Sequence, residues 1–109
     1  MIRTAIISGA ALLVLAGCED PKNAVLFDGQ RFSGRLQADS ENKRNFTATV
    51  APVSLSLEGA REAARYEGTT YCVRKYGSSD IIWALSPDAE ATALSVADDQ
   101  LTVQGRCAE

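Results

Sequence analysis

The feature that most limits the fold is a segment with helical periodicity, flanked on both sides by shorter segments that suit β-strands. From Leu57 to Tyr76, apolar and small residues recur along one stripe with a period of about 3.6 residues. Ser54 or Ser56 can cap the beginning of this segment, and Gly77 can adopt the left-handed conformation that ends a helix. The spacing therefore predicts a helix over residues 57–76.

Two sets of side chains on this helix have different expected surroundings. Small residues on the stripe would allow the helix to lie close to a sheet, and they are Ala60, Ala63, Ala64 and Gly68. Charged residues with the spacing of exposed ion pairs are Arg61, Glu62, Arg65 and Glu67. We expect the charged side to be a solvated surface rather than a binding site.

Three segments before the helix are typical of β-strands. Ala24–Phe27 is an apolar run that ends at the turn dipeptide Asp28-Gly29, and Arg31–Ala38 carries apolar residues on one side. After a polar loop, Phe46–Val50 alternates between apolar residues and threonines, and Pro52 ends the ladder. The pattern predicts a meander of two or three strands.

Three segments after the helix also suit strands. Asp80–Leu85 is nearly all apolar, which favours a central strand covered on both faces. Leu94–Val96 and Leu101–Val103 then predict a hairpin around residues 97–100. We predict one α+β domain over residues 24–109, in which an antiparallel sheet of about five strands carries one central helix on one face, in the order β-β-β-α-β-β-β.

The N-terminal segment resembles the leader of bacterial lipoproteins. Arg3 precedes an apolar run over Ala5–Ala16, whose length of about 18 Å as a helix is well short of the roughly 30 Å bilayer core. Leu15-Ala16-Gly17-Cys18 is similar to the lipobox, in which small residues precede the cysteine that receives the lipid. The resemblance implies that residues 1–17 are removed and that Cys18 is acylated. A plain secretory signal or a short buried helix are the alternatives.

The residues after Cys18 predict where the domain works. In this family an Asp directly after the cysteine favours the inner membrane, whereas Glu19 stands here, so the resemblance favours the outer membrane, facing the periplasm. Residues 19–23 span at most about 20 Å as an extended chain. The expected partners are the membrane, through the lipid on Cys18, and an envelope protein close to it. The region 24–109 resembles small, uncharacterised bacterial envelope lipoproteins with a disulfide-bearing helix.

Two cysteines remain once Cys18 is assigned to the lipid. Cys72 lies on the inward stripe of the helix, and Cys107 shares a strand face with Leu101 and Val103. In an exported domain this arrangement predicts a Cys72–Cys107 disulfide, which closes a loop of about 36 residues and stabilises by roughly 3 to 4 kcal/mol in the chain-entropy model. Two buried free thiols are the alternative, and a redox role is disfavoured because there is no Cys-x-x-Cys motif.

The composition disfavours several classes of chemistry. The chain has no His, so the usual base for Ser or Cys nucleophiles and the commonest zinc ligand are missing. Removal of the leader takes away Arg3 alone among the charged residues, which changes the net charge from −3 to −4 and argues against a nucleic-acid partner. The acidic pairs Asp88 with Glu90 and Asp98 with Asp99 lack the spacing of a calcium loop. We expect no catalytic, cofactor-binding or metal-ligating residues.

Aromatic residues are the remaining candidates for recognition. Tyr71 and Trp83 lie in apolar patterns and are expected in the core, whereas Tyr66 lies off the helix stripe and is a candidate interface residue. The sequence therefore predicts a non-enzymatic interaction or structural module of the cell envelope. A small-ligand-binding or inhibitor lipoprotein, similar in size and export route to lysozyme inhibitor lipoproteins, is the alternative.

Overall fold

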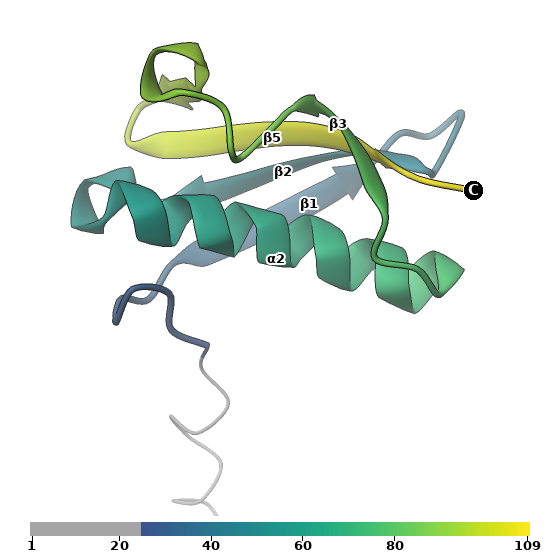
Figure 1. Cartoon of the computed structure of the whole chain (residues 1–109), viewed down its shortest axis with the longest axis horizontal. Helices are drawn as coiled ribbons and strands as arrows, with labels where there is room; N and C mark the ends of the chain where they lie inside the picture. The colour runs from purple at the N-terminus through teal and green to yellow at the C-terminus, as the bar shows by residue number, and fades with distance from the viewer. Residues whose placement is uncertain (1–24) are drawn as a thin grey trace, which may run out of the picture.

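The computed structural model of the chain describes residues 25–109 (Figure 1). The predicted leader, the predicted lipid attachment at Cys18 and the predicted tether over residues 19–23 lie outside the described residues. Within residues 25–109, no helix is both long enough and apolar enough to cross a membrane.

The described residues form one sheet and one long helix, with two short 3-10 helices. In chain order the elements are β1 (Ser33–Ala38), β2 (Asn45–Ala51), η2 (Val53–Leu55), α2 (Leu57–Tyr76), β3 (Ile81–Leu85), η3 (Ala91–Ala93), β4 (Ser95–Ala97) and β5 (Gln100–Cys107). The helix lies across one face of the sheet, so the fold has two layers (Figure 1). The structure confirms the predicted α+β class, with five antiparallel strands and one helix.

The sheet is built around its last strand. The order is β1-β2-β5-β3, and β4 also pairs with β5, all in antiparallel directions. Because β2 occupies one side of β5, β3 and β4 share its other side, with β4 along the first residues of β5 and β3 along the last. The predicted hairpin of the last two strands is confirmed, and its turn uses Asp98 and Asp99 at positive φ.

Alternation along β2 and β5 produces the core. Every second residue of each strand points toward α2 and is buried, and these residues are Phe46, Ala48, Val50, Leu101, Val103, Gly105 and Cys107. The helix contributes buried Ala60, Ala63 and Ala64. Burial of these faces removes apolar surface from water, which is the main favourable contribution of the core.

Local signals account for the ends of α2. The Ser56 hydroxyl accepts a hydrogen bond from the Gly59 amide at 2.9 Å, and Gly77 ends the helix in the left-handed conformation with φ 77°. The helix spans Leu57–Tyr76, as predicted. Its close approach to the sheet depends on Gly68, where a Cβ atom would lie 2.8 Å from the Phe46 ring.

The element order before the helix differs from the prediction. Two strands precede α2 rather than three, so the order is β-β-α-β-β-β. The segment expected as a first strand begins outside the described residues at Ala24, and its end forms only an isolated bridge between Phe27 and Gln30. The turn at Asp28-Gly29 folds this short segment back on itself, with Asp28 and Gly29 at positive φ, so it joins no neighbouring strand.

The prediction that Asp80–Leu85 forms a central strand covered on both faces is wrong. Its strand, β3, is an outer strand that pairs only with β5, and the side chain of Ile82 is 61% exposed. Ile81 and Trp83 point toward the helix layer and contact the core, while Ile82 and Ala84 are exposed on the other face. The apolar run of β3 is therefore covered on one face only, and Ile82 is exposed on the other face.

Candidate functional site

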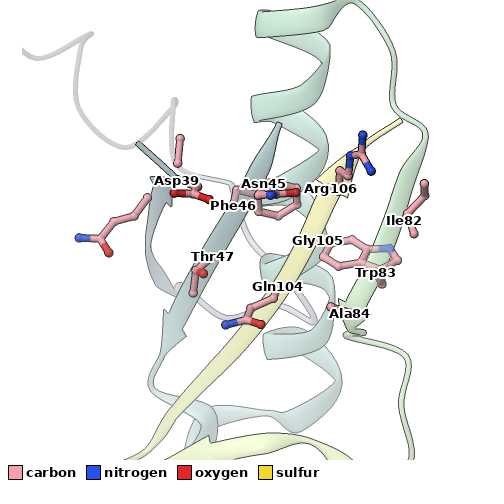
Figure 2. Close-up of a pocket in the computed structure, with 12 residues that line it drawn as sticks. Asp39, Asn45, Phe46, Thr47, Ile82, Trp83, Ala84, Gln104, Gly105 and Arg106 are labelled. Atoms are coloured by element: carbon pink, nitrogen blue, oxygen red, sulfur yellow. The ribbon is translucent and has the colours of Figure 1, made fainter. Parts of the chain in front are cut away.

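The face of the sheet opposite α2 contains an open concavity. Its volume is about 570 Å³, and Figure 2 shows side chains from several strands around it. The lining residues are Gln37, Ala38, Asp39, Asn45, Phe46, Thr47, Ile82, Trp83, Ala84, Gln104, Gly105 and Arg106. We call the face that carries this concavity the open face.

The strand register arranges hydrogen-bonding side chains in rows across the open face. Gln37 pairs with Thr47, and Thr47 pairs with Gln104, so three uncharged polar side chains lie across β1, β2 and β5. Two residues further along β5 from Gln104, Arg106 lies beside Ile82 of β3. The open face therefore offers amide and hydroxyl groups for hydrogen bonds beside the exposed apolar side chain of Ile82.

A second concavity lies between α2 and the outer strand β1. It has a volume of about 400 Å³, and we call it the β1–α2 groove. Its lining residues are Leu36, Tyr66, Glu67, Thr70, Tyr71, Arg74 and Lys75. Tyr66, the predicted interface residue, is 43% exposed in this groove, and its ring lies 5.4 Å from that of Phe27.

Tyr71 and Trp83 belong to the aromatic cluster at one end of the core, as expected. Both are partly buried, and their rings lie 5.9 and 5.7 Å from the ring of Phe46. The Tyr71 hydroxyl donates a hydrogen bond to the backbone carbonyl of Lys43. Burial raises the pKa of Tyr71 above its ordinary value, and the neighbouring Tyr76 raises it further.

The structure brings Cys72 and Cys107 together as a disulfide, with their Cα atoms 5.5 Å apart. Both cysteines are fully buried, so the bond joins the last third of α2 to the end of β5 inside the core. Beside this bond, the Arg44 guanidinium lies 4.1 Å from the centre of the Tyr76 ring and donates to the carbonyls of Cys107 and Ala108. These contacts hold the C-terminal end of the chain against the rest of the fold.

The expectation of a solvated charged surface on α2 is wrong for Arg61. Its side chain is only 14% exposed, and its Nη1 donates to the carbonyls of Pro87, at 3.0 Å, and Ala89. Arg65 forms an ion pair with Asp88 of the same loop. These two arginines hold the loop between β3 and η3 against the helix, and helical spacing alone carries no signal for such a contact.

Acidic turn residues also have structural partners. The Asp99 carboxylate accepts hydrogen bonds from the amide and the hydroxyl of Ser54, both at 2.8 Å. The Ser56 hydroxyl donates to Asp28 at 2.6 Å, which ties the N-terminal turn to the start of α2. In the part of the chain that the structure describes, no three Cys, Asp or Glu side chains converge as a metal site.

Comparison with protein-family models, with curated proteins and with solved structures finds no match to this chain. The candidate binding sites of the described residues are therefore the open face and the β1–α2 groove.

Proposed function

We propose that this chain is a lipid-anchored lipoprotein of the bacterial envelope that acts by binding another envelope component rather than by catalysis. The support for the anchor is the sequence Leu15-Ala16-Gly17-Cys18 after an apolar leader. The five residues of the tether hold the domain within about 20 Å of the lipid. The binding partner is then a component at the same membrane, the outer membrane in view of Glu19.

The observation that carries the binding role is the open face of the sheet. It places the 61% exposed Ile82 beside a concavity of about 570 Å³ that is lined by a row of uncharged hydrogen-bonding side chains and by the charged Asp39 and Arg106. Protein-binding surfaces combine an apolar centre with a polar rim that forms hydrogen bonds, and Ile82 would supply that centre here. Arg61, Arg65 and Asp99, by contrast, are engaged with the chain itself.

Mass spectrometry of the chain extracted from membranes tests the anchor. We expect a mature chain that begins at Cys18 and carries the mass of its acyl groups, and we expect Cys18→Ser to remain uncleaved and unacylated. A mature chain that begins at Cys18 without acyl mass would contradict the anchor.

Crosslinking in intact cells tests the open face. Affinity purification of the tagged chain is compared between the native sequence and Ile82→Asp, with Val73→Asp as the matched control. Val73 is also exposed, at 46%, but it lies on the helix layer. We expect a reproducible envelope partner that Ile82→Asp loses and Val73→Asp retains. Equal recovery from both variants would refute the role of the open face.

A second candidate function is the binding of a small ligand or an inhibited enzyme. The volume of the open-face concavity lies in the range of about 300 to 1,000 Å³ typical of ligand pockets, and Trp83 contributes to its lining. Tyr66 and Tyr71, however, line the separate β1–α2 groove. A lysozyme turbidity assay with the purified chain tests the inhibitor reading, since inhibition supports it and unchanged lysis removes it.

A further inference from the structure

The outer edge of β1 differs from the opposite edge of the sheet. β1 pairs with β2 in a regular register over six residues, from Ser33 to Ala38, without a bulge or a proline. On the opposite edge, the register of β3 shifts between Trp83 and Leu85, and β4 has only three residues. Bulges and short strands protect sheet edges from further pairing, so β1, whose one charged residue is Arg35, is the less protected edge.

The hydrogen-bond pattern shows which groups of β1 point outward. The Asp39 amide donates to the carbonyl of Asn45, which continues the β1–β2 ladder. Because the bonds of an antiparallel strand alternate between its two sides, Gly34, Leu36 and Ala38 direct their amides and carbonyls away from β2. Among residues 25–109 no backbone hydrogen bond reaches that side of β1.

The β1–α2 groove beside this edge carries charges of both signs. Glu67 lies over Gly34, and Arg74 and Lys75 lie toward the end of the helix. None of the ion pairs of the described residues includes these three side chains. The groove is therefore acidic at one point and basic about two helical turns away.

We infer that this edge binds a second copy of the chain, with the two β1 strands antiparallel about a two-fold axis at Leu36. This register pairs Gly34 of each copy with Ala38 of the other and Leu36 with Leu36. It therefore satisfies all the outward amides and carbonyls of β1 in both copies. The two sheets then form one continuous sheet, with both helices on the same face.

The same axis makes the groove charges complementary. Glu67 lies over Gly34, and Leu36 is about 6.6 Å further along the strand, a distance that about four helical residues cover. The axis through Leu36 therefore passes close to Tyr71, which lines the groove with Leu36. Rotation about it places Glu67 of one copy opposite Arg74 and Lys75 of the other, twice in the dimer. A single axis that satisfies both the backbone and the charges favours a second copy over an unrelated strand.

Photo-crosslinking in membranes of cells that express the full chain tests this pairing. A benzophenone amino acid replaces Gln37, which is exposed on β1, or, as the control, Ala97, which is exposed on β4 at the opposite edge. We expect an adduct of twice the chain mass from position 37 and at least tenfold less from position 97. Equal yields at the two positions, or no adduct of twice the chain mass from position 37, would overturn the inference.

Charge exchange tests the axis itself. With the crosslinker at position 37, Glu67→Arg or Arg74→Glu alone is expected to lower the dimer adduct at least threefold, and the double exchange Glu67→Arg with Arg74→Glu to restore it. Circular dichroism of each purified variant verifies the fold, and Arg74→Glu is the informative single change because Arg74 is exposed. A double exchange that folds but does not restore the adduct would refute this register.

The proposed dimer edge, β1, and the proposed partner-binding residue, Ile82, lie on different strands. Ile82 lies on β3, at the edge away from β1. We expect Ile82→Asp to abolish binding of the envelope partner while the dimer adduct from position 37 is unchanged. Loss of that adduct in a folded Ile82→Asp variant would contradict the assignment of β1 as the dimer edge.

Discussion

At the scale of single residues, Tyr71 connects three parts of the molecule. Its ring packs on Phe46 of β2 and near Tyr76 of α2, and its hydroxyl donates to the backbone of the loop at Lys43. The neutral phenol is required as the donor, and burial followed by the effect of Tyr76 raises the pKa of Tyr71 above 10.0. Tyr71 therefore makes the stability of the fold sensitive to alkaline pH.

The sign of this effect follows from the direction of the shift. Because the pKa of Tyr71 is higher in the folded chain than in the unfolded chain, its contribution is complete below the ordinary value of 10.0 and is lost as the pH rises through the folded value. We expect the free energy of unfolding to fall between pH about 9 and about 11, and to fall less in Tyr71→Phe. Urea denaturation of the native chain and of Tyr71→Phe at the two pH values measures this fall in the free energy of unfolding. Identical losses in the two proteins would contradict the prediction.

Arg61 makes a second residue-scale prediction. Its guanidinium donates to two loop carbonyls from a largely buried position, so Arg61→Ala should lower the free energy of unfolding by about 2 kcal/mol. Its neighbour Glu62 is exposed, and Glu62→Ala should change stability by less than about 0.5 kcal/mol. Chemical denaturation compares the two variants, and similar losses would show that Arg61 does not hold the loop.

The role of Arg61 could not be predicted because its partners are remote in the chain. The carbonyls of Pro87 and Ala89 are 26 and 28 residues away, and they belong to a loop without a pattern that fixes its position. The charge spacing of the helix indicates only which residues neighbour one another along α2. The contact between Asp99 and Ser54 could not be predicted either, because these residues are 45 positions apart in the chain.

At the scale of secondary structure, α2 was predictable from local signals, whereas the position of β3 in the sheet was not. The cap at Ser56, the stop at Gly77 and the small-residue stripe all lie within the segment or next to it. Whether an apolar run becomes a central or an outer strand depends on its partners. Here β3 and β4 both pair with the same side of β5, and no local feature of Asp80–Leu85 indicates this arrangement. The open face was therefore not expected from the sequence.

The contact between α2 and the sheet predicts the effect of a single methyl group. In an isolated helix, Gly68→Ala would be favourable by about 1 kcal/mol, but here the added Cβ would lie 2.8 Å from the Phe46 ring and 3.1 Å from the Trp83 ring. We expect a net loss of about 1 to 2 kcal/mol in the free energy of unfolding. Val73→Ala, at an exposed helix position, measures propensity alone and should be neutral or slightly stabilising. A stabilising Gly68→Ala would show that the two layers can separate without cost.

At the scale of the whole molecule, the layers are held together by a small apolar core and one covalent link. The buried helix residues are mostly alanine and glycine, which bring little apolar area each, so α2 depends on close contact rather than on large side chains. The Cys72–Cys107 bond joins helix and sheet at the end where Phe46, Tyr71 and Trp83 gather. The sequence indicated this pair because both cysteines lie on inward faces, a pattern that local periodicity does report.

The disulfide should therefore decide how stable the domain is. Replacement of both cysteines, Cys72→Ser with Cys107→Ser, removes a link between residues 35 apart and should lower the free energy of unfolding by roughly 3 to 4 kcal/mol, because the unfolded chain gains the entropy of the open loop. Denaturation of the native chain with and without reductant provides the comparison. We expect the reduced native chain to approach the stability of the double variant, and reductant to leave that variant unchanged. A native chain whose unfolding midpoint does not respond to full reduction would show that packing of α2 on the sheet suffices to hold the two layers.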